Sequence, residues 1–162
     1  MWLTTDEFNF LPILAPIDMA TGAAISTNII QMQNYDSAVI GIHCGLLAND
    51  GVWYLKEYTA KATSSQVMPA VAYYRLSGGA AGSTADTLGT RTSVASSGIA
   101  ITNGTHDGLT YYVEVKSADL DAGYTGVGIY FPVISTGALM SATAVMKPKY
   151  LQKTMISATV VS

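Results

Sequence analysis

Hydrophobic and polar residues alternate along much of this chain with the two-residue period of β-strands, and helical periodicity is almost absent. The alternation is clearest in residues 111–116 and 127–131, where successive side chains would point to opposite faces of a sheet. The residues expected on the inner face of these segments are Tyr111, Val113, Val115, Val127, Ile129 and Phe131. Tyr112, Glu114 and Lys116 are expected on the outer face. A strand buried on one side only is typical of an antiparallel sheet.

Turn residues separate about eight segments of this kind, which predicts about eight strands. The predicted strands are residues 26–33, 38–45, 52–60, 71–76, 98–102, 109–116, 126–133 and 138–147. Asn49, Asp50 and Gly51 predict a hairpin, because Asn and Asp tolerate the left-handed conformation and Gly favours it. Residues 98–133 should form contiguous antiparallel strands, and Ser117 can cap a single helical turn. Together these features predict an all-β fold, an antiparallel β-sandwich or jelly roll.

Both ends of the chain and one internal stretch lack this alternation. Residues 1–25 contain Pro12 and Pro16, and residues 77–97 are rich in Gly, Ala, Ser and Thr, as long surface loops are. We predict an extended N-terminal arm at 1–25, a sandwich domain at 26–147 and a C-terminal extension at 148–162. Because proline-broken segments do not pair fully in a sheet, we expect a core that folds without the arms and arms that contact other subunits. The candidate interface residues are Trp2, Phe8, Phe10, Leu11, Ile13, Leu14, Ile17, Lys147, Lys149, Tyr150 and Lys153.

The composition supports this expectation of contact between subunits. Only 12% of the 162 residues are charged, against about a quarter in an ordinary domain, and the mean hydropathy is +0.31. A monomer of this size normally carries many more surface charges, so we expect other protein subunits to cover much of this surface. The net charge of −3 gives no general reason to bind nucleic acid. No apolar stretch is long enough to cross a membrane. Because the first seven residues carry two acids and no basic residue, we expect no secretory signal.

Charge is distributed unevenly between the ends. Residues 1–36 hold four acidic residues and no Lys or Arg, whereas residues 147–162 hold three lysines and no acidic residue. Opposite charges of this kind favour pairing between the two ends or between neighbouring subunits. The alternative is that this uneven distribution arises by chance, because the chain has few charged residues.

Candidate catalytic and metal-binding residues are few. His43 and Cys44 are adjacent in a predicted strand, so they should face opposite sides and not share a metal ion. His106 and Asp107 resemble an acid–base pair, but no G-x-S-x-G sequence supplies a nucleophile, and we favour a polar loop. The glycine-rich residues 77–83 lack the lysine of a phosphate-binding loop. We therefore expect no enzymatic activity, no cofactor and no metal ion.

The ten tyrosines are the most informative candidates for binding. Tyr73–Tyr74 and Tyr111–Tyr112 are adjacent pairs, so each pair should have one ring in the core and one ring outside. Outward tyrosines combine apolar area with a polar tip and suit either a protein contact or a carbohydrate platform. We favour the protein contact, because clustered Asp, Asn and Trp residues do not accompany them.

Several segments together resemble a known group of proteins. They are the proline-broken residues 11–17, the strand end 74–78 followed by a loop with Asp86 and Gly89, Gly123–Tyr124, and the closing residues 146–154. In order and character, most of the chain resembles small virion structural proteins of tailed bacteriophages, closest to the head-decoration or cement type. The resemblance implies a trimer on a three-fold or quasi-three-fold axis of the capsid, with arms that reach neighbouring subunits and with no catalytic residues.

The expected function is therefore that of a non-enzymatic capsid decoration protein. Its expected partners are itself, as a homotrimer, and the major capsid protein or other virion subunits, with no nucleic acid or membrane partner. We expect it in the virion, assembled in the host cytoplasm. The alternatives are a head–tail connector or tail component, a carbohydrate-binding module on a virion fibre, and a hydrolase that uses His106 and Asp107.

Overall fold

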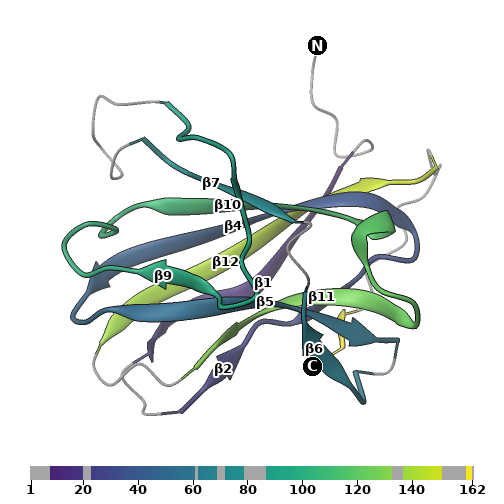
Figure 1. Ribbon diagram of the computed structural model, residues 1–162, viewed down its shortest axis with the longest axis horizontal. Coiled ribbons are helices and arrows are strands. Elements are labelled where there is room, and N and C mark those ends of the chain that lie inside the picture. Colours follow the sequence, from purple (N-terminus) through teal and green to yellow (C-terminus); the bar gives the residue numbers. More distant parts are fainter. Residues whose placement is uncertain are drawn as a thin grey trace.

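The computed structural model describes residues 8–19, 23–60, 62–68, 72–78, 87–132, 137–150 and 160–161. These residues form two antiparallel β-sheets that pack face to face (Figure 1), with a turn of 3-10 helix at Ser117–Asp119. This confirms the prediction of an all-β antiparallel sandwich. No helix in the described part of the chain is long and apolar enough to span a membrane.

The six strands of the first sheet, called sheet A, lie in the order β1-β12-β4-β10-β7-β8. Their bounds are β1 (Asn9–Asp18), β12 (Ala138–Pro148), β4 (Tyr35–Leu47), β10 (Thr110–Lys116), β7 (Tyr73–Leu76) and β8 (Thr92–Ser93). The second sheet, called sheet B, has the order β13-β3-β11-β5-β6, with β2 beside β11 and β9 beside β5. Its strands are β13 (Val160–Val161), β3 (Ile29–Gln31), β11 (Tyr124–Phe131), β5 (Gly51–Thr59), β6 (Ser65–Val67), β2 (Ile25–Ser26) and β9 (Ile99–Ile101).

Each of the eight predicted segments contains strand structure, and the predicted inner positions are correct. The inner-face residues, all at most 4% exposed, are Ile99, Ile101, Tyr111, Val113, Val115, Val127, Ile129 and Phe131. Between the sheets, the ring of Trp53 from β5 meets the ring of Tyr111 from β10 edge to face, with centroids 5.6 Å apart. The Tyr111 hydroxyl donates a hydrogen bond to the carbonyl oxygen of Ala100 at 2.9 Å. These contacts join the two sheets through the core.

The predicted pairing of consecutive strands is wrong in two places. Asn49 and Asp50 do reverse the chain, but β4 pairs with β10 and β12, whereas β5 pairs with β11, β6 and β9. The chain therefore crosses from sheet A to sheet B instead of forming a hairpin. Strands β9, β10 and β11 likewise alternate between the sheets and are not contiguous. Turn residues specify a change of direction, while the choice of neighbour depends on which sheet buries the apolar face of the next strand.

The N-terminal segment also differs from its prediction. Asn9–Asp18 forms β1 at the edge of sheet A and pairs with β12 from Asn9 opposite Met146 to Asp18 opposite Leu139. The segment was expected not to pair fully in a sheet, and its pairing is indeed interrupted by register shifts, but these residues belong to the sandwich and not to a separate arm. An edge strand tolerates proline because only one of its sides bonds to a neighbour. The register shifts between Pro12 and Ile17 accommodate the remaining irregularity.

The segment expected to be a C-terminal extension begins within the sandwich. Strand β12 continues to Pro148, and the backbone of Val160–Val161 pairs with β3 of sheet B. The rest of that segment after Tyr150 lies outside the described residues.

Candidate functional site

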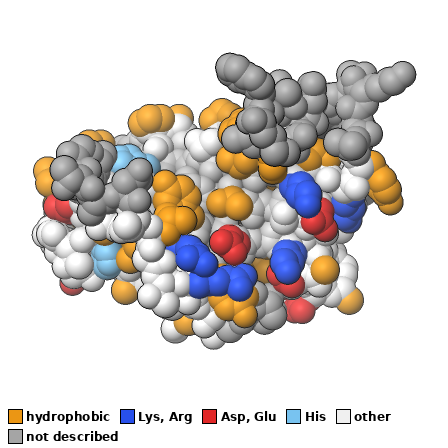
Figure 2. All heavy atoms as spheres, turned by 90° about the horizontal axis from the view of Figure 1, so that it is seen from above, with side chains coloured by type: hydrophobic (Ala, Val, Ile, Leu, Met, Phe, Trp, Pro, Cys, Tyr) orange, Lys and Arg blue, Asp and Glu red, His pale blue; other side chains and the backbone are white. Residues whose placement is uncertain are grey.

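Large apolar side chains are exposed mainly on sheet A. Those exposed on the strands of this sheet are Phe10 (55%), Val39 (38%), Leu46 (72%), Tyr112 (37%) and Leu139 (55%). Of the described residues, two further examples, Leu88 and Tyr150, lie outside the strands, and the strands of sheet B carry none. Sheet B covers the inner side of sheet A, so we call the opposite side the outer face. Figure 2, seen from the side of sheet A, shows apolar side chains close to acidic and basic ones.

Strand register arranges part of this surface into a row. Phe10 of β1 lies opposite Val145 of β12, and Val145 lies opposite Val39 of β4. Directly opposite residues on one face of a sheet have Cβ atoms about 4.5–5.5 Å apart, which is close enough for contact. These three residues form what we call the apolar stripe. At β10 the row reaches Glu114, whose partner on β7 is Tyr73.

A charged cluster adjoins the apolar stripe. The Glu114 carboxylate lies 3.3 Å from the Arg91 guanidinium and 4.0 Å from the Arg75 guanidinium. The Arg91 guanidinium carbon also lies 3.7 Å from the centre of the Tyr73 ring. Pairs as exposed as these, with about two-fifths of each side chain accessible, contribute roughly 0–1 kcal/mol to stability. Their main effect is to hold the guanidinium and carboxylate groups in a fixed arrangement on the outer face.

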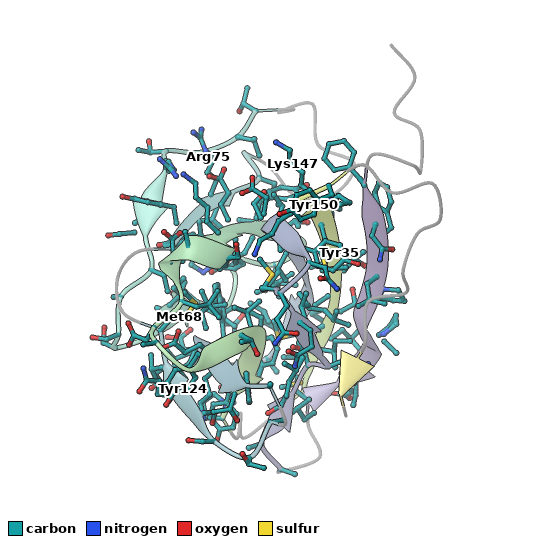
Figure 3. All side chains as sticks on the ribbon, turned by 90° about the vertical axis from the view of Figure 1, so that its right-hand side faces the viewer. Tyr35, Met68, Arg75, Tyr124, Lys147 and Tyr150 are labelled. Carbon is teal, nitrogen blue, oxygen red and sulfur yellow. The ribbon has the colours of Figure 1, made fainter. Side chains whose placement is uncertain are left out.

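A pocket of about 460 Å³ lies beside this cluster, at the end of sheet A where β10 ends. The side chains that give it chemical character are Ser37, Val39, Tyr73, Arg91, Glu114, Lys116 and Asp119. Ser37 has Lys116 and Lys147 as its cross-strand partners, so cations and carboxylates are mixed at this end of the sheet. Figure 3 shows Arg75 and Lys147 on the side of sheet A and Tyr124 on the opposite side of the molecule.

The predicted N-terminal interface residues divide between the surface and the core. Phe10 lies on the outer face, and Phe8 is half-buried just before β1. Ile13 is 2% exposed within the core of its own chain, so its prediction as a residue that contacts another subunit is wrong. The reason is that β1 belongs to the sandwich. The side chains that are partly buried against this same core are Leu11, Leu14 and Ile17. Trp2 lies outside the described residues.

The predicted C-terminal interface residues lie near the same end of sheet A. Lys147 is exposed on the outer face, and Tyr150 is 74% exposed beyond β12. The Lys149 ammonium donates a hydrogen bond to the carbonyl oxygen of Gln33 at 3.0 Å. Lys153 lies outside the described residues.

The sequence analysis did not select the apolar stripe beyond Phe10 or the charged cluster. Val39 and Val145 lie at outward positions of strands whose inward positions are also apolar, so alternation does not distinguish them. The sequence does contain a weak signal for this surface, because apolar residues at outward positions of a strand can indicate a contact site. The pairing of Arg75 and Arg91 with Glu114 depends on strand order and has no local signal.

His43 and Cys44 face opposite sides of β4, as predicted. His43 is exposed, with Nδ1 3.2 Å from the Thr110 hydroxyl, while Cys44 is fully buried. Burial, assisted by the nearby Asp107 carboxylate, raises the pKa of the Cys44 thiol from 9.0 to about 12. The described residues contain no group of three His, Cys, Asp or Glu side chains that could hold a metal ion.

His106 and Asp107 each bind a different part of the backbone. The amide of Thr102 donates to Nδ1 of His106 at 2.7 Å, and the amide of Leu47 donates to the Asp107 carboxylate at 3.2 Å. This arrangement fits a polar loop, in which the side chains satisfy backbone groups. The two residues therefore make separate contacts instead of the histidine–carboxylate contact of an acid–base pair.

The tyrosine pairs have the predicted orientations. Tyr111 is fully buried and Tyr112 is 37% exposed, while Tyr74 packs against the core and Tyr73 lies under Arg91 on the outer face. Two outward rings thus belong to the same surface as the apolar stripe. Their common location supports a binding role for this surface without deciding between protein and carbohydrate.

A buried carboxylate at one end of sheet B was not predicted. Glu57 has no solvent exposure, and it accepts hydrogen bonds from the Gln66 amide nitrogen at 2.6 Å and from the Asp121 backbone amide at 3.0 Å. The Tyr124 hydroxyl donates to the Gln66 side-chain oxygen at 3.2 Å. These bonds tie β6 and the start of β11 to β5, and they supply the hydrogen-bond partners that a buried polar group needs.

The fold of this chain is similar to that of a solved protein structure. No protein-family model matches the sequence, and no curated protein matches it. The fold is similar to the crystal structure of SPBc2 prophage-derived protein YomS, with 9% sequence identity and a TM-score of 0.44. The match covers 86% of this chain and 93% of that chain.

Proposed function

We propose that this chain is a non-enzymatic structural subunit of a tailed-phage virion, of the capsid decoration type, and that it acts through protein contacts. The observation that carries the proposal is the concentration of exposed large apolar side chains on the strands of sheet A. A contiguous apolar surface bordered by polar residues is typical of a protein contact site. The virion assignment comes from the sequence resemblance to decoration proteins.

The contact uses the outer face of sheet A and not its strand edges. One edge strand, β1, contains Pro12 and Pro16, and the other, β8, has two residues. Prolines and very short edge strands prevent the addition of a further strand. Burial of an exposed Phe, Leu or Val side chain contributes about 1.5–3 kcal/mol at most, so a few such residues on the face are enough to drive association.

The subunit partner is a second and third copy of the chain, together with the capsid surface. A closed symmetric ring is the usual way to cover a self-complementary surface, and the low charge of 12% accords with a surface that is covered in the assembly. The expected species has about three times the chain mass of 17.0 kDa. A density map of assembled particles that places the chain anywhere except the capsid exterior would contradict the decoration role.

Sedimentation velocity at micromolar concentration tests the contact surface directly. We expect Phe10→Lys to shift the wild-type oligomer toward monomer, because a charge is placed in the apolar stripe. Leu88→Lys is the matched control, since Leu88 is 58% exposed, similar to Phe10, but lies outside the strands of sheet A. Equal effects of the two substitutions would contradict a contact through the outer face.

A carbohydrate-binding role is the second candidate, and the pocket beside Tyr73, Arg91 and Glu114 is the observation in its favour. An aromatic ring next to paired donors and acceptors suits a ligand with many hydroxyl groups. Binding on a glycan array that disappears in Glu114→Ala would support this role. Absence of binding on the array leaves the protein-contact proposal as the sole candidate.

A further inference from the structure

Strand β4 turns a leucine outward near its end because its pairing with β12 is irregular there. Met140 of β12 lies opposite Cys44 and Ala138 lies opposite Leu47, so β4 has one residue more than β12 in this interval. An extra residue of this kind forms a β-bulge, which changes the face to which a side chain points. With strict alternation Leu46 would share the inward face of Cys44. Instead, Cys44 and Leu47 are both buried and Leu46 is 72% exposed.

Leu139 of β12 faces this bulge on the outer side of sheet A. A Cβ atom added at Gly45 would lie 2.9 Å from the Cβ atom of Leu139, so the Leu139 side chain stands directly against the bulge. Leu139 is itself 55% exposed. Two large aliphatic side chains are therefore accessible at this end of the outer face, and we call Leu46 and Leu139 the bulge cluster.

The bulge cluster and the apolar stripe are separate surfaces on the same face. On β12, Leu139 of the bulge cluster and Val145 of the apolar stripe are six residues apart, which corresponds to about 20 Å. The outward residues between the two clusters on β4 and β12 are Gly41, His43, Ser141 and Thr143. These residues are polar or lack a side chain, so the apolar surface is interrupted between the two ends.

The charges of the outer face do not select a strongly acidic or basic partner. In the described part of the chain, the cations of this face are Arg75, Arg91, Lys116 and Lys147, and the carboxylates on the face or at its border are Asp18, Asp36, Glu114 and Asp119. The two signs balance, so the complementary surface also has mixed charge together with apolar groups. The outer face of another copy has this composition. The described strands of sheet B expose no large apolar side chain, so they offer no such match.

We propose that the bulge cluster of one copy packs against the apolar stripe of a neighbouring copy. A ring of three copies joins different surfaces of adjacent subunits, and two separate clusters on one face provide them. Around a three-fold axis, one end of each outer face then meets the other end of the next outer face. This inference rests on the proposed self-association and names the two surfaces that meet.

Two charges introduced into the full-length chain test this pairing. Phe10→Glu places a carboxylate in the apolar stripe, and Leu46→Lys places an ammonium group in the bulge cluster. Both positions are exposed, so each variant should keep the wild-type circular dichroism spectrum. Each single substitution should raise the dissociation constant measured by analytical ultracentrifugation about tenfold, which corresponds to about 1.4 kcal/mol.

The chain that carries both substitutions should recover most of the lost association, because the carboxylate of one copy meets the ammonium group of the next. Within one copy the two positions lie near opposite ends of the face, about 20 Å apart along the strands. This distance is about twice the screening length of ~10 Å at 0.1 M salt. Recovery therefore reports a contact between copies.

Like-charge chains are the matched controls, since the same two positions change and only the sign differs. One carries Phe10→Lys with Leu46→Lys, and the other carries Phe10→Glu with Leu46→Glu. They shift the net charge of −3 by two charges in opposite directions, whereas the opposite-charge chain keeps it. Both controls should associate more weakly than either single variant. If a like-charge chain recovers as well as the opposite-charge chain does, the effect comes from net charge and the inference is overturned.

The remaining outcomes separate this inference from the proposed function. An opposite-charge chain that associates no better than the single variants would overturn the inference. Recovery on mixing Phe10→Glu with Phe10→Lys chains would instead show that stripe packs on stripe, which also overturns it. Association that Phe10→Glu weakens and Leu46→Lys leaves unchanged would keep the outer-face contact and exclude the bulge cluster from it. A wild-type chain that is monomeric at every concentration would contradict the self-association in the proposed function itself.

Discussion

Phe131 and Phe10 allow the same substitution to be made in opposite environments of the sandwich. Phe131 lies in the core at the end of β11 and has no solvent exposure, whereas Phe10 lies on edge strand β1 and is 55% exposed. Replacement of either residue by Ala removes the same atoms. Any difference in effect therefore reports the difference in burial.

The expected loss of stability is large for the buried residue and small for the exposed one. Phe131→Ala should lower the free energy of unfolding by about 3–5 kcal/mol, which includes the cost of the cavity. Phe10→Ala should lower the free energy of unfolding by about 1 kcal/mol, because Phe10 is about half buried and full burial contributes about 1.5–3 kcal/mol. With an unfolding entropy of about 0.34 kcal/mol/K for 162 residues, the melting temperature should fall by about 9–15 °C and about 3 °C, respectively.

Urea unfolding measures these differences, with tryptophan fluorescence as the signal because Trp53 is fully buried in the native core. Sedimentation velocity on the same samples should show the reverse order, with Phe10→Ala weakening association and Phe131→Ala leaving it unchanged wherever the protein is folded. A loss below about 1 kcal/mol for Phe131→Ala would contradict the assignment of β11. It would indicate a strand register wrong by one residue, which exchanges the inner and outer faces.

Three further predictions concern a thiol, a glycine and the N-terminal strand. Because burial raises the pKa of Cys44 to about 12, the neutral thiol stabilises the fold fully below about pH 9, and this contribution decreases as the pH rises toward 12. Cys44→Ala should flatten that part of the stability profile measured by urea unfolding. Gly45→Ala should cost about 1–3 kcal/mol in the same assay, because its Cβ would lie 2.9 Å from the Cβ of Leu139. Deletion of residues 1–8 should leave the circular dichroism spectrum unchanged, whereas deletion of residues 1–18 removes β1 and should abolish cooperative unfolding.

Local alternation was enough to predict the class of fold and the inner face of its strands. Side chains on a strand alternate between faces whatever the neighbours of that strand are, so Val113 inside and Tyr112 outside follow from sequence position alone. The opposite orientations of His43 and Cys44 follow from the same geometry. The polar role of His106 could also be predicted, because it lies in a stretch of polar and glycine residues that is typical of a loop.

Strand neighbours and the composition of the outer face depended on the tertiary structure. Asn49 and Asp50 specify a turn equally well for a hairpin and for a crossing between sheets, and only the burial available in each sheet decides between them. The prolines of β1 led to the prediction of an arm. A sheet tolerates proline in an edge strand, but the sequence alone does not show that β1 is an edge strand. Arg91 and Glu114 are 23 positions apart in the sequence and meet because β7 lies between β8 and β10. Such contacts arise from the packing of the whole sandwich, and no local pattern encodes them.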